Sequence, residues 1–211
     1  MCGRFTLGFQ PEELVKTFAA EQISEPVPPS YNIAPTDNAN IISSNAGLVS
    51  CSKMSWGFDL KGSAKVFNAR LETLLEKWRF KKSAQSMRCL VPATGWYEWT
   101  KADDGGKDPH YFSSPKTELL ALGGLYEIAA DGPRFTIITR PATEKLQHIH
   151  NRMPLVLPKK AWDLWLNPDE TNVADTDFIH NATEEFEFTT RLVSRKVNYS
   201  SAEGTDLILP I

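Results

Sequence analysis

The sequence predicts a single α+β domain, built on a mainly antiparallel β-sheet or barrel-like core with helices at its periphery. Many short segments rich in β-branched and aromatic residues alternate with turn residues, whereas helical patterns are few. The 211 residues are 41% hydrophobic and 23% charged, a composition that can bury one sizeable core. We therefore expect one domain over residues 1–211.

Two helices and a hairpin are expected in the first half of the chain. Pro11–Ala19 begins with a proline and two acidic residues, which favour the first turn of a helix. Leu71–Ser83 places its apolar side chains, Trp78 among them, on one helical face. Between these helices, Ala39–Ser43 and Leu48–Trp56 flank a short turn and predict a β-hairpin.

The remainder of the chain is predicted to form loops, strands and one short helix. Glu25–Pro35 contains four prolines, so it cannot form a helix or a central strand. Asp103–Lys107 is predicted to be a solvated hairpin turn, and Pro158 to open a short helix. Six further strand-like segments are Met87–Pro92, Trp96–Thr100, His110–Ser113, Leu119–Tyr126, Phe135–Thr139 and a late one with Phe186, Phe188 and Leu192.

Composition and charge exclude several classes of protein. The net charge of −3 gives no overall attraction to nucleic acid, so an anionic partner must bind a local patch. Three cysteines, widely separated and odd in number, predict neither a disulfide framework nor a cysteine-rich zinc site. No apolar run reaches the length of a membrane span, and a secretory signal is not recognisable. We expect a cytoplasmic monomer that makes no membrane contact and is nucleoid-associated if bacterial.

The second residue offers chemistry that an internal cysteine lacks. If Met1 is removed, Cys2 becomes the amino terminus and carries a thiol beside a free α-amine. Such an aminothiol condenses with an aldehyde to an imine, which the thiol then closes to a five-membered thiazolidine. The two groups titrate at about 8.5 and about 7.8, so small environmental shifts suffice to activate them near neutral pH.

Six short groups of glycine, aromatic and polar residues stand out along the chain: Met1–Phe5, Tyr31–Pro35, Trp56–Phe58, Asn68–Thr73, Gly95–Trp99 and His148–Pro154. In this order they resemble the SRAP (SOS response-associated peptidase) family, whose members crosslink abasic sites in single-stranded DNA. The family pattern runs MCGR[FY], NxAP, WG, NAR-x-ET, G-W-[FY]-E-W and H-x-R-M-P, and the chain contains every motif. The resemblance covers nearly its whole length.

This resemblance implies a set of catalytic residues. It makes Cys2 the covalent nucleophile after removal of Met1. Asn68 would orient the terminal amine or the bound sugar. Glu98 would be the general acid and base, with His150 as a second proton-transfer group. The product would be a thiazolidine that shields the abasic site, and neither a cofactor nor a metal is expected.

The resemblance also implies residues that contact single-stranded DNA. Arg4, Arg70 and Arg152 are candidates to bind backbone phosphates in a local basic groove. Trp56 and Pro35 are candidates to pack against bases. A structural alternative is open for one of the cations, because Arg70 could pair with Glu72 at the start of a helix.

The predicted chemistry suits the substrate. An abasic deoxyribose is mostly a closed hemiacetal, so proton transfers must release its aldehyde before an amine can attack. A carboxyl and an imidazole with tuned pKa values can carry out these transfers. Strand alternation places Glu98 on the face opposite Tyr97 and Trp99, so other neighbours must desolvate it and raise its pKa.

Two other functions are compatible with the same residues. A thiol amidohydrolase or self-processing peptidase would use Cys2, His150 and Asn68 as nucleophile, base and orienting group. A non-catalytic binder of single strands would make Cys2 incidental. His148 and His150 could share a strand face and hold a metal, but no third ligand has suitable spacing. Several other residues are expected in the core, namely Cys51, Cys89, Trp96, Trp99, Trp162 and Trp165.

Overall fold

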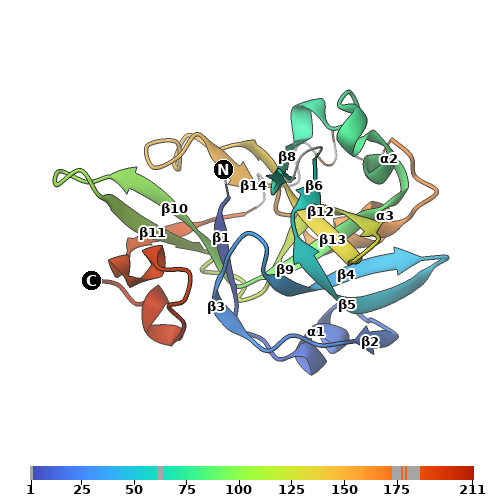
Figure 1. Ribbon diagram of the computed structural model, residues 1–211, viewed down its shortest axis with the longest axis horizontal. Coiled ribbons are helices and arrows are strands. Elements are labelled where there is room, and N and C mark those ends of the chain that lie inside the picture. The colour runs from blue at the N-terminus through green and yellow to red at the C-terminus, as the bar shows by residue number, and fades with distance from the viewer. Residues whose placement is uncertain (1, 61–63, 173–176, 178, 180–185) are drawn as a thin grey trace.

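Five strands close into a barrel at the centre of the computed structural model, which describes residues 2–60, 64–172, 177, 179 and 186–211 (Figure 1). Neighbours in the order β5-β4-β9-β12-β13 are antiparallel, and a short parallel contact between β13 and β5 closes the ring. The closing pairs are Arg134 with Ser55 and Phe135 with Trp56. This arrangement confirms the predicted α+β class with a barrel-like core. The barrel strands are β4 (Asn38–Asn45), β5 (Leu48–Trp56), β9 (Arg88–Ala93), β12 (Leu120–Ala129) and β13 (Gly132–Pro141).

Shorter strands extend the barrel, and two of them meet at one end of β13. β8 (Asn68–Arg70) runs parallel to β13, and β14 (Arg152–Pro154) runs antiparallel to it. Thr139 pairs with Arg70 on one side and with Pro154 on the other. The segments that carry Asn68 and Arg152 therefore lie at the same corner. The remaining short strands are β2 (Gln22–Ser24) along β5, and the pair β6 (Phe58–Asp59) and β7 (Lys65–Val66).

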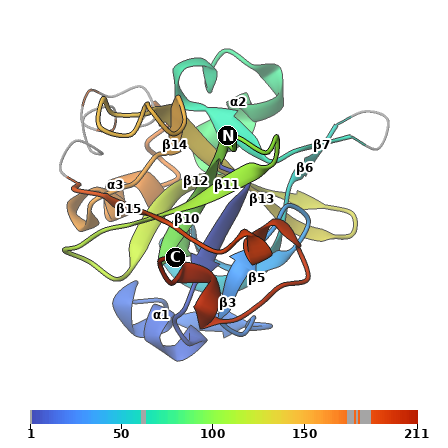
Figure 2. The same cartoon turned by 90° about the vertical axis from the view of Figure 1, so that its left-hand side faces the viewer.

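A second sheet lies beside the barrel and has the strand order β15-β11-β10-β1-β3. Its first strand passes between β10 and β3, with Arg4 opposite Tyr97. In Figure 1 the β10–β11 hairpin projects away from the barrel, and Figure 2 shows the end of the chain crossing this sheet. The strands of this sheet are β1 (Arg4–Leu7), β3 (Ser30–Ile33), β10 (Gly95–Lys101), β11 (Lys107–Ser113) and β15 (Thr189–Leu192).

Short α-helices lie at the periphery, and those whose bounds the described residues give are α1 (Pro11–Thr17), α2 (Trp78–Ser86) and α3 (Trp162–Leu166). The first is confirmed and is shorter than expected by two residues. The predicted helix Leu71–Ser83 is wrong in its first half, which forms only a 3₁₀ turn at Leu71–Thr73. Because Lys77 is extended (φ −75°, ψ 116°), α2 begins anew at Trp78. The side chain of Trp78 is therefore 77% exposed instead of buried.

The late part of the chain also departs from the prediction. β15 begins at Thr189, so Phe186 and Phe188 precede it and pack on the core from outside the strand. The proline-rich stretch contains β3, which is an edge strand and therefore compatible with the prolines around it. The strands β1, β2 and β14 are too short to produce an alternating pattern of their own.

The barrel interior is filled by aromatic and aliphatic side chains. Trp56 is fully buried, lies 5.3 Å from the Phe5 ring centre in an edge-on contact, and stacks on Phe135 at 6.0 Å. Trp96, Trp165, Cys51 and Cys89 are buried as expected, and Trp99 and Trp162 pack against the core with part of their surface exposed. A second, smaller apolar cluster joins β10 and β11 to the end of the chain. In the described part of the chain, no helix has both the length and the apolarity to cross a membrane.

Candidate functional site

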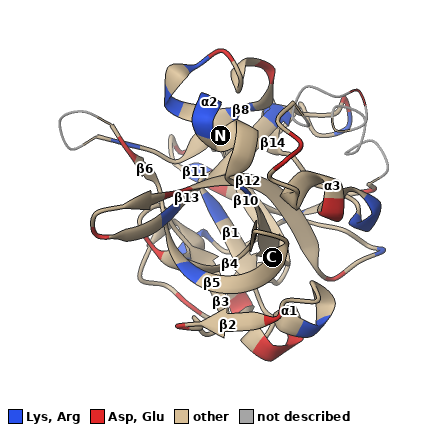
Figure 3. Cartoon of the chain, turned by 90° about the vertical axis from the view of Figure 1, so that its right-hand side faces the viewer, with Lys and Arg blue, Asp and Glu red and all other residues tan. Residues whose placement is uncertain are grey.

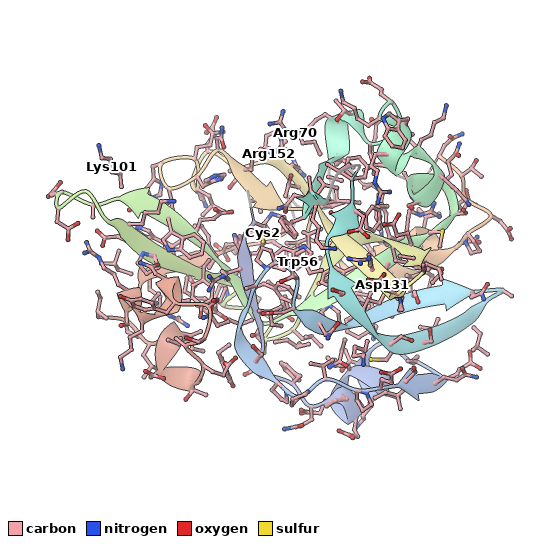
Figure 4. The ribbon with its side chains drawn as sticks, viewed as in Figure 1. Cys2, Trp56, Arg70, Lys101, Asp131 and Arg152 are labelled. Carbon is pink, nitrogen blue, oxygen red and sulfur yellow. The ribbon has the colours of Figure 1, made fainter. Side chains whose placement is uncertain are left out.

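Cys2 lies immediately before β1, between the two sheets, with its side chain fully buried and its thiol free. Its carbonyl oxygen accepts a hydrogen bond of 2.9 Å from the Asn68 Nδ2 atom. Figure 4 shows Cys2 near the centre of the molecule, below the labelled Arg152 and Arg70. Met1 lies outside the described residues. The backbone of the predicted nucleophile is thus fixed by another predicted site residue.

The amide of Asn68 has a second, unused polar atom. Since a carbonyl oxygen accepts only from a donor, the contact with Cys2 assigns Nδ2 to that side and leaves Oδ1 on the other. Oδ1 is buried, and no partner for it is found among the described residues. A buried acceptor without a partner costs free energy unless a ligand supplies a donor. Asn68 can therefore accept a hydrogen bond from an amine or a hydroxyl.

Glu98 lies on β10 and is almost fully buried, with only 2% of the residue exposed. Its neighbours Tyr97 and Trp99 face the second apolar cluster, so strand alternation directs Glu98 to the opposite face, as predicted. Burial raises the pKa of Glu98 from 4.5 to about 8. A carboxyl in this environment keeps its proton at neutral pH and can donate it.

His150 lies at the end of a turn that precedes β14, and its Nε2 atom is 3.9 Å from Glu98 Oε2. Its Nδ1 atom lies 3.0 Å from the Arg152 backbone nitrogen and 3.1 Å from the Arg152 carbonyl oxygen. In the tautomer that donates from Nδ1 to this carbonyl, the Nε2 lone pair faces Glu98 and can accept a proton. Burial lowers the pKa of His150, so the ring is neutral at neutral pH. The carboxyl and the imidazole form one proton-transfer pair.

The histidines do not form the strand pair that a metal site would need. His148 and His150 occupy a turn instead of a strand, so they are not held on one face by strand alternation. No cluster of three or more metal-ligating side chains is found within the described residues.

A cavity of about 590 Å³ opens beside the pair. Glu98 and His150 line its inner end, and the β10–β11 hairpin lines the rest. The hairpin residues are Trp99, Thr100, Lys101, Gly105, Gly106 and Lys107. The cavity has the size of a small-molecule site, so a sugar and part of its backbone can enter it.

The thiol of Cys2 is protonated in this environment. Burial raises its pKa far above the ordinary value, and the nearby carboxylate form of Glu98 raises it further. Thiolate chemistry at neutral pH would need the opposite shift. The geometry therefore favours a reaction in which the thiol acts late and gives up its proton during the step.

Two of the three predicted phosphate-binding arginines lie together on the rim above Cys2 (Figure 4). Arg70 is exposed, and within the described residues it has no ion pair. Arg152 instead donates to Glu72 at 2.5 and 2.9 Å and to the Thr139 carbonyl at 2.6 Å. The alternative pairing of Arg70 with Glu72 is thus wrong, because Glu72 binds Arg152. A phosphate at Arg152 has to share its guanidinium with Glu72.

Arg4 is turned into the protein. Its Nη1 atom donates to Asn32 Oδ1 at 2.6 Å and to the Val197 carbonyl at 2.9 Å. Asn32 in turn donates to the carbonyls of Tyr199 and Ala202. Through Nη1 the guanidinium ties β1 to the C-terminal segment (residues 193–211), while the contact of Arg4 with a phosphate stays a prediction.

An Arg4→Gln variant is expected to lose about 2 to 4 kcal/mol of unfolding free energy, because two charge-assisted hydrogen bonds disappear. Urea denaturation measures the loss. Arg70→Gln is the matched control, since Arg70 is exposed and should change stability by less than about 0.5 kcal/mol. Unchanged stability in Arg4→Gln, together with weaker DNA binding, would show that Arg4 acts on the ligand instead.

The aromatic contacts to bases are only partly available. Trp56 has no exposed surface, and its Nε1 atom donates to the Phe67 carbonyl at 2.8 Å, so the prediction that it packs against bases is wrong. Its role is to fill the barrel. Pro35 is half-buried, close to the end of β5, because Thr36 N–H donates to the Trp56 carbonyl at 3.0 Å. Pro35 stays a candidate contact.

Sequence reasoning missed the residues that hold the site together. Glu72 and Thr139 orient Arg152, and Asn32 orients Arg4. Lys101 and Lys107 line the cavity, although the turn between them suggested only a solvated hairpin. Glu72 and Asn32 lie within the NAR-x-ET and NxAP motifs, so their place in those motifs was the available signal.

The structure is an α+β barrel with a buried cysteine near its start, close to a carboxyl–imidazole pair. The family model for SOS response associated peptidase (SRAP) matches residues 1–200. The chain therefore belongs to this family, as the motifs indicated.

Curated relatives share most of their length with this chain. The Bacillus subtilis abasic site processing protein YoqW is 34% identical over 200 residues, covering 89% of this chain and 88% of the relative. The Escherichia coli abasic site processing protein YedK is 28% identical, with both chains fully covered. Among solved structures, a phage-related protein from Bordetella bronchiseptica is 26% identical with a TM-score of 0.77, covering 92% of this chain and 95% of that protein. A Bacteroides thetaiotaomicron protein with 19% identity and a TM-score of 0.79, covering 100% of both chains, shares the fold.

Proposed function

We propose that this protein, once Met1 has been removed, binds single-stranded DNA and captures abasic sites covalently as a thiazolidine at Cys2. The observation that carries the proposal is a chain of contacts between four segments distant in sequence. Asn68 holds the Cys2 backbone, Glu98 is close enough to Cys2 to raise the pKa of its thiol, and His150 pairs with Glu98 beside the cavity. Membership of the family and the relatives' description as abasic site processing proteins support the substrate. Capture shields the lesion from strand cleavage.

The first step is opening of the abasic sugar. Neutral His150 and protonated Glu98 are suited to it, because one takes the anomeric hydroxyl proton while the other protonates the ring oxygen. The C–O bond of the hemiacetal ring breaks and the free aldehyde appears. The proton that Glu98 gives up returns through His150, so the pair ends in its starting state.

The second step joins protein and DNA. The α-amine of Cys2 attacks the aldehyde carbon, and the resulting carbinolamine loses water to form an imine. The thiol then adds to the imine carbon, its proton goes to the nitrogen, and the thiazolidine ring is closed. One water molecule is released, and no oxidant or cofactor is needed. A protonated thiol fits this order, because it is needed only for closure.

Asn68 is suited to hold the reacting groups in place. Its Nδ2 atom fixes the Cys2 carbonyl, while its buried Oδ1 atom has no partner within the described residues. We assign that acceptor to the Cys2 α-amine or to a hydroxyl of the sugar. A single amide would then set both the direction of the nucleophile and the position of the substrate.

The strand that carries the lesion is proposed to lie along the rim with Arg70. Because Arg70 is exposed and has no ion pair among the described residues, its charge is available for a phosphate. Binding through phosphates makes affinity fall with rising salt, since each contact releases counterions. The net charge of −3 confines this attraction to the site itself.

The amidohydrolase or peptidase alternative is weaker on this geometry. An enzyme of that kind needs a cysteine thiolate beside a base, whereas burial and Glu98 both raise the pKa of Cys2. No observation within the described residues favours it. Turnover of an amide or peptide substrate by the purified protein would support it over abasic-site capture.

The proposal is tested by incubating the purified protein with a single-stranded oligonucleotide that contains one abasic site. We expect a protein–DNA band that survives denaturation, with a mass equal to the sum of the two partners less one water. Mass measurement of the protein beforehand establishes whether Met1 has been removed. A protein that begins at Cys2 and yet forms no such band would contradict the proposal.

A further inference from the structure

Two lysines face each other at the outer end of the catalytic cavity. Lys101 is the last residue of β10 and Lys107 the first of β11, and they are directly opposite in the antiparallel register. Both are exposed, and both line the cavity that has Glu98 and His150 at its inner end. Like charges directly opposite each other on a sheet are unfavourable. Such a pair is stabilised by an anion.

The acidic residues of the hairpin do not neutralise these lysines. Arg195, from the C-terminal segment, binds Asp104 at 2.5 Å and Asp108 at 2.7 Å. Neither Lys101 nor Lys107 has an ion pair within the described part of the chain. Asp104 and Asp108 are thus bound by Arg195, while the two ammonium groups are left for a ligand.

The hairpin is held in a fixed orientation by the same C-terminal segment. Asn198 accepts a hydrogen bond of 2.6 Å from Trp99 Nε1 and donates one of 3.2 Å to the Lys107 carbonyl. Figure 4 shows Lys101 at the outer part of the hairpin, on the same upper edge of the molecule as Arg152 and Arg70. Cations therefore follow this edge on both sides of Cys2.

We propose that Lys101 and Lys107 form a phosphate subsite that holds the backbone of the abasic strand beyond the captured sugar. The proposal rests on the proposed function, because it takes Glu98 and His150 as the place of the sugar. Lys101 is three positions beyond Glu98 on β10, a span of about 10 Å, which a nucleic-acid strand covers in a few nucleotides. Arg70 would hold the strand on the other side of the lesion.

The test compares K101Q/K107Q with the matched control K16Q/K159Q, which removes two exposed lysines from α1 and from the turn before α3. The probe is a single-stranded oligonucleotide with a tetrahydrofuran site, which has no aldehyde, so equilibrium binding is measured without crosslinking. We expect K101Q/K107Q to bind about 25-fold more weakly at 0.1 M salt and to reduce the salt slope by about 1.4, the amounts for two phosphate contacts. The control should match the wild-type protein.

A scan with single neutral methylphosphonate linkages locates the subsite. At the contacted positions, the neutral linkage should weaken wild-type binding about fivefold and leave K101Q/K107Q unaffected. Equal losses in both proteins at every position, or a salt slope equal to that of the control, would overturn the subsite. Thermal unfolding should show no loss of stability in K101Q/K107Q, because a repulsive pair has been removed.

Failure of this proposal is distinguishable from failure of the proposed function. Wild-type protein and control are also incubated with a true abasic strand. If neither forms an adduct, the proposed function is wrong. If both form it and K101Q/K107Q binds the probe as the control does, only the subsite is wrong. If the double variant fails to fold, Lys107→Gln alone carries the test, with about half the expected change in salt slope.

Discussion

A Glu98→Gln variant is expected to form the covalent adduct about 100-fold more slowly than the wild-type protein at neutral pH, while its affinity for abasic DNA stays within about twofold. The amide cannot exchange the proton that opens the sugar ring, and Glu98 lies at the inner end of the cavity, away from the arginine rim. Single-turnover crosslinking and binding to a tetrahydrofuran oligonucleotide measure the two quantities separately. Glu12→Gln, exposed on α1, is the control.

The pH dependence gives a sharper form of the same prediction. The α-amine of Cys2 must lose its proton, with a pKa of about 7.8, so the rate rises with pH on the acid side. Glu98 must keep its proton, with a pKa of about 8, so the rate falls on the alkaline side. We expect a bell-shaped profile with its maximum near these values. The falling limb should be absent in Glu98→Gln, and its persistence would assign it to another group.

Stability should respond to pH at the same residue. The Glu98 carboxyl releases its proton near pH 4.5 in the unfolded chain and only near pH 8 in the folded protein. The folded state therefore loses stability as the pH rises from 4.5 to 8. Relative to wild type, Glu98→Gln should gain about 3 to 5 kcal/mol between the two ends of the window. Urea denaturation across this range measures the difference, and a constant difference would exclude a buried proton on Glu98.

Insertion of one glycine ahead of Cys2 is expected to reduce the denaturation-resistant adduct to background. The thiol survives in this variant, but the terminal amine now belongs to glycine, so an aldehyde can form only an imine or a labile hemithioacetal. Cys2→Ala tests the other half of the pair, because it keeps a terminal amine and loses the sulfur. Its imine should be trapped only when borohydride is added.

The control for this prediction is a glycine inserted at the exposed turn Ala46–Gly47 between β4 and β5, which lengthens the chain away from the site. It should crosslink like the wild-type protein. An adduct of normal stability from the protein with glycine ahead of Cys2 would show that the amine of Cys2 takes no part. Intact masses must confirm the new amino terminus in each variant.

The sequence was sufficient for the barrel-like class and for the orientation of Glu98, because both follow from strand alternation. A residue between two aromatics on a strand must face the other way, and Glu98 does. The sequence indicated that Glu98 must be desolvated, but not by which residues. The raised pKa depends on how deeply the fold buries Glu98, and the sequence does not show which distant segments, such as the turn that carries His150, pack against it.

The predictions that failed concern partners distant in sequence. The contact of Arg4 with the Val197 carbonyl was not foreseen, because a local sequence pattern cannot reveal a partner so far along the chain. Trp56 lies at the closing contact of the barrel, which exists only once β13 meets β5. Trp78 was predicted to lie on the buried face of a helix that starts at Leu71. The extended Lys77 interrupts that helix, and Trp78 instead begins a new one with its side chain exposed.

The hydrogen bond between Arg4 and the Val197 carbonyl affects when during synthesis the site can form. Cys2 and the strand β1 that follows it leave the ribosome long before residues 197–202, yet the carbonyls that bind Arg4 and Asn32 belong to those late residues. Contacts so far apart in sequence form late in folding. During synthesis the cysteine is therefore an ordinary thiol on an unanchored strand, and an organised site exists only after residues 197–202 have been made and have docked.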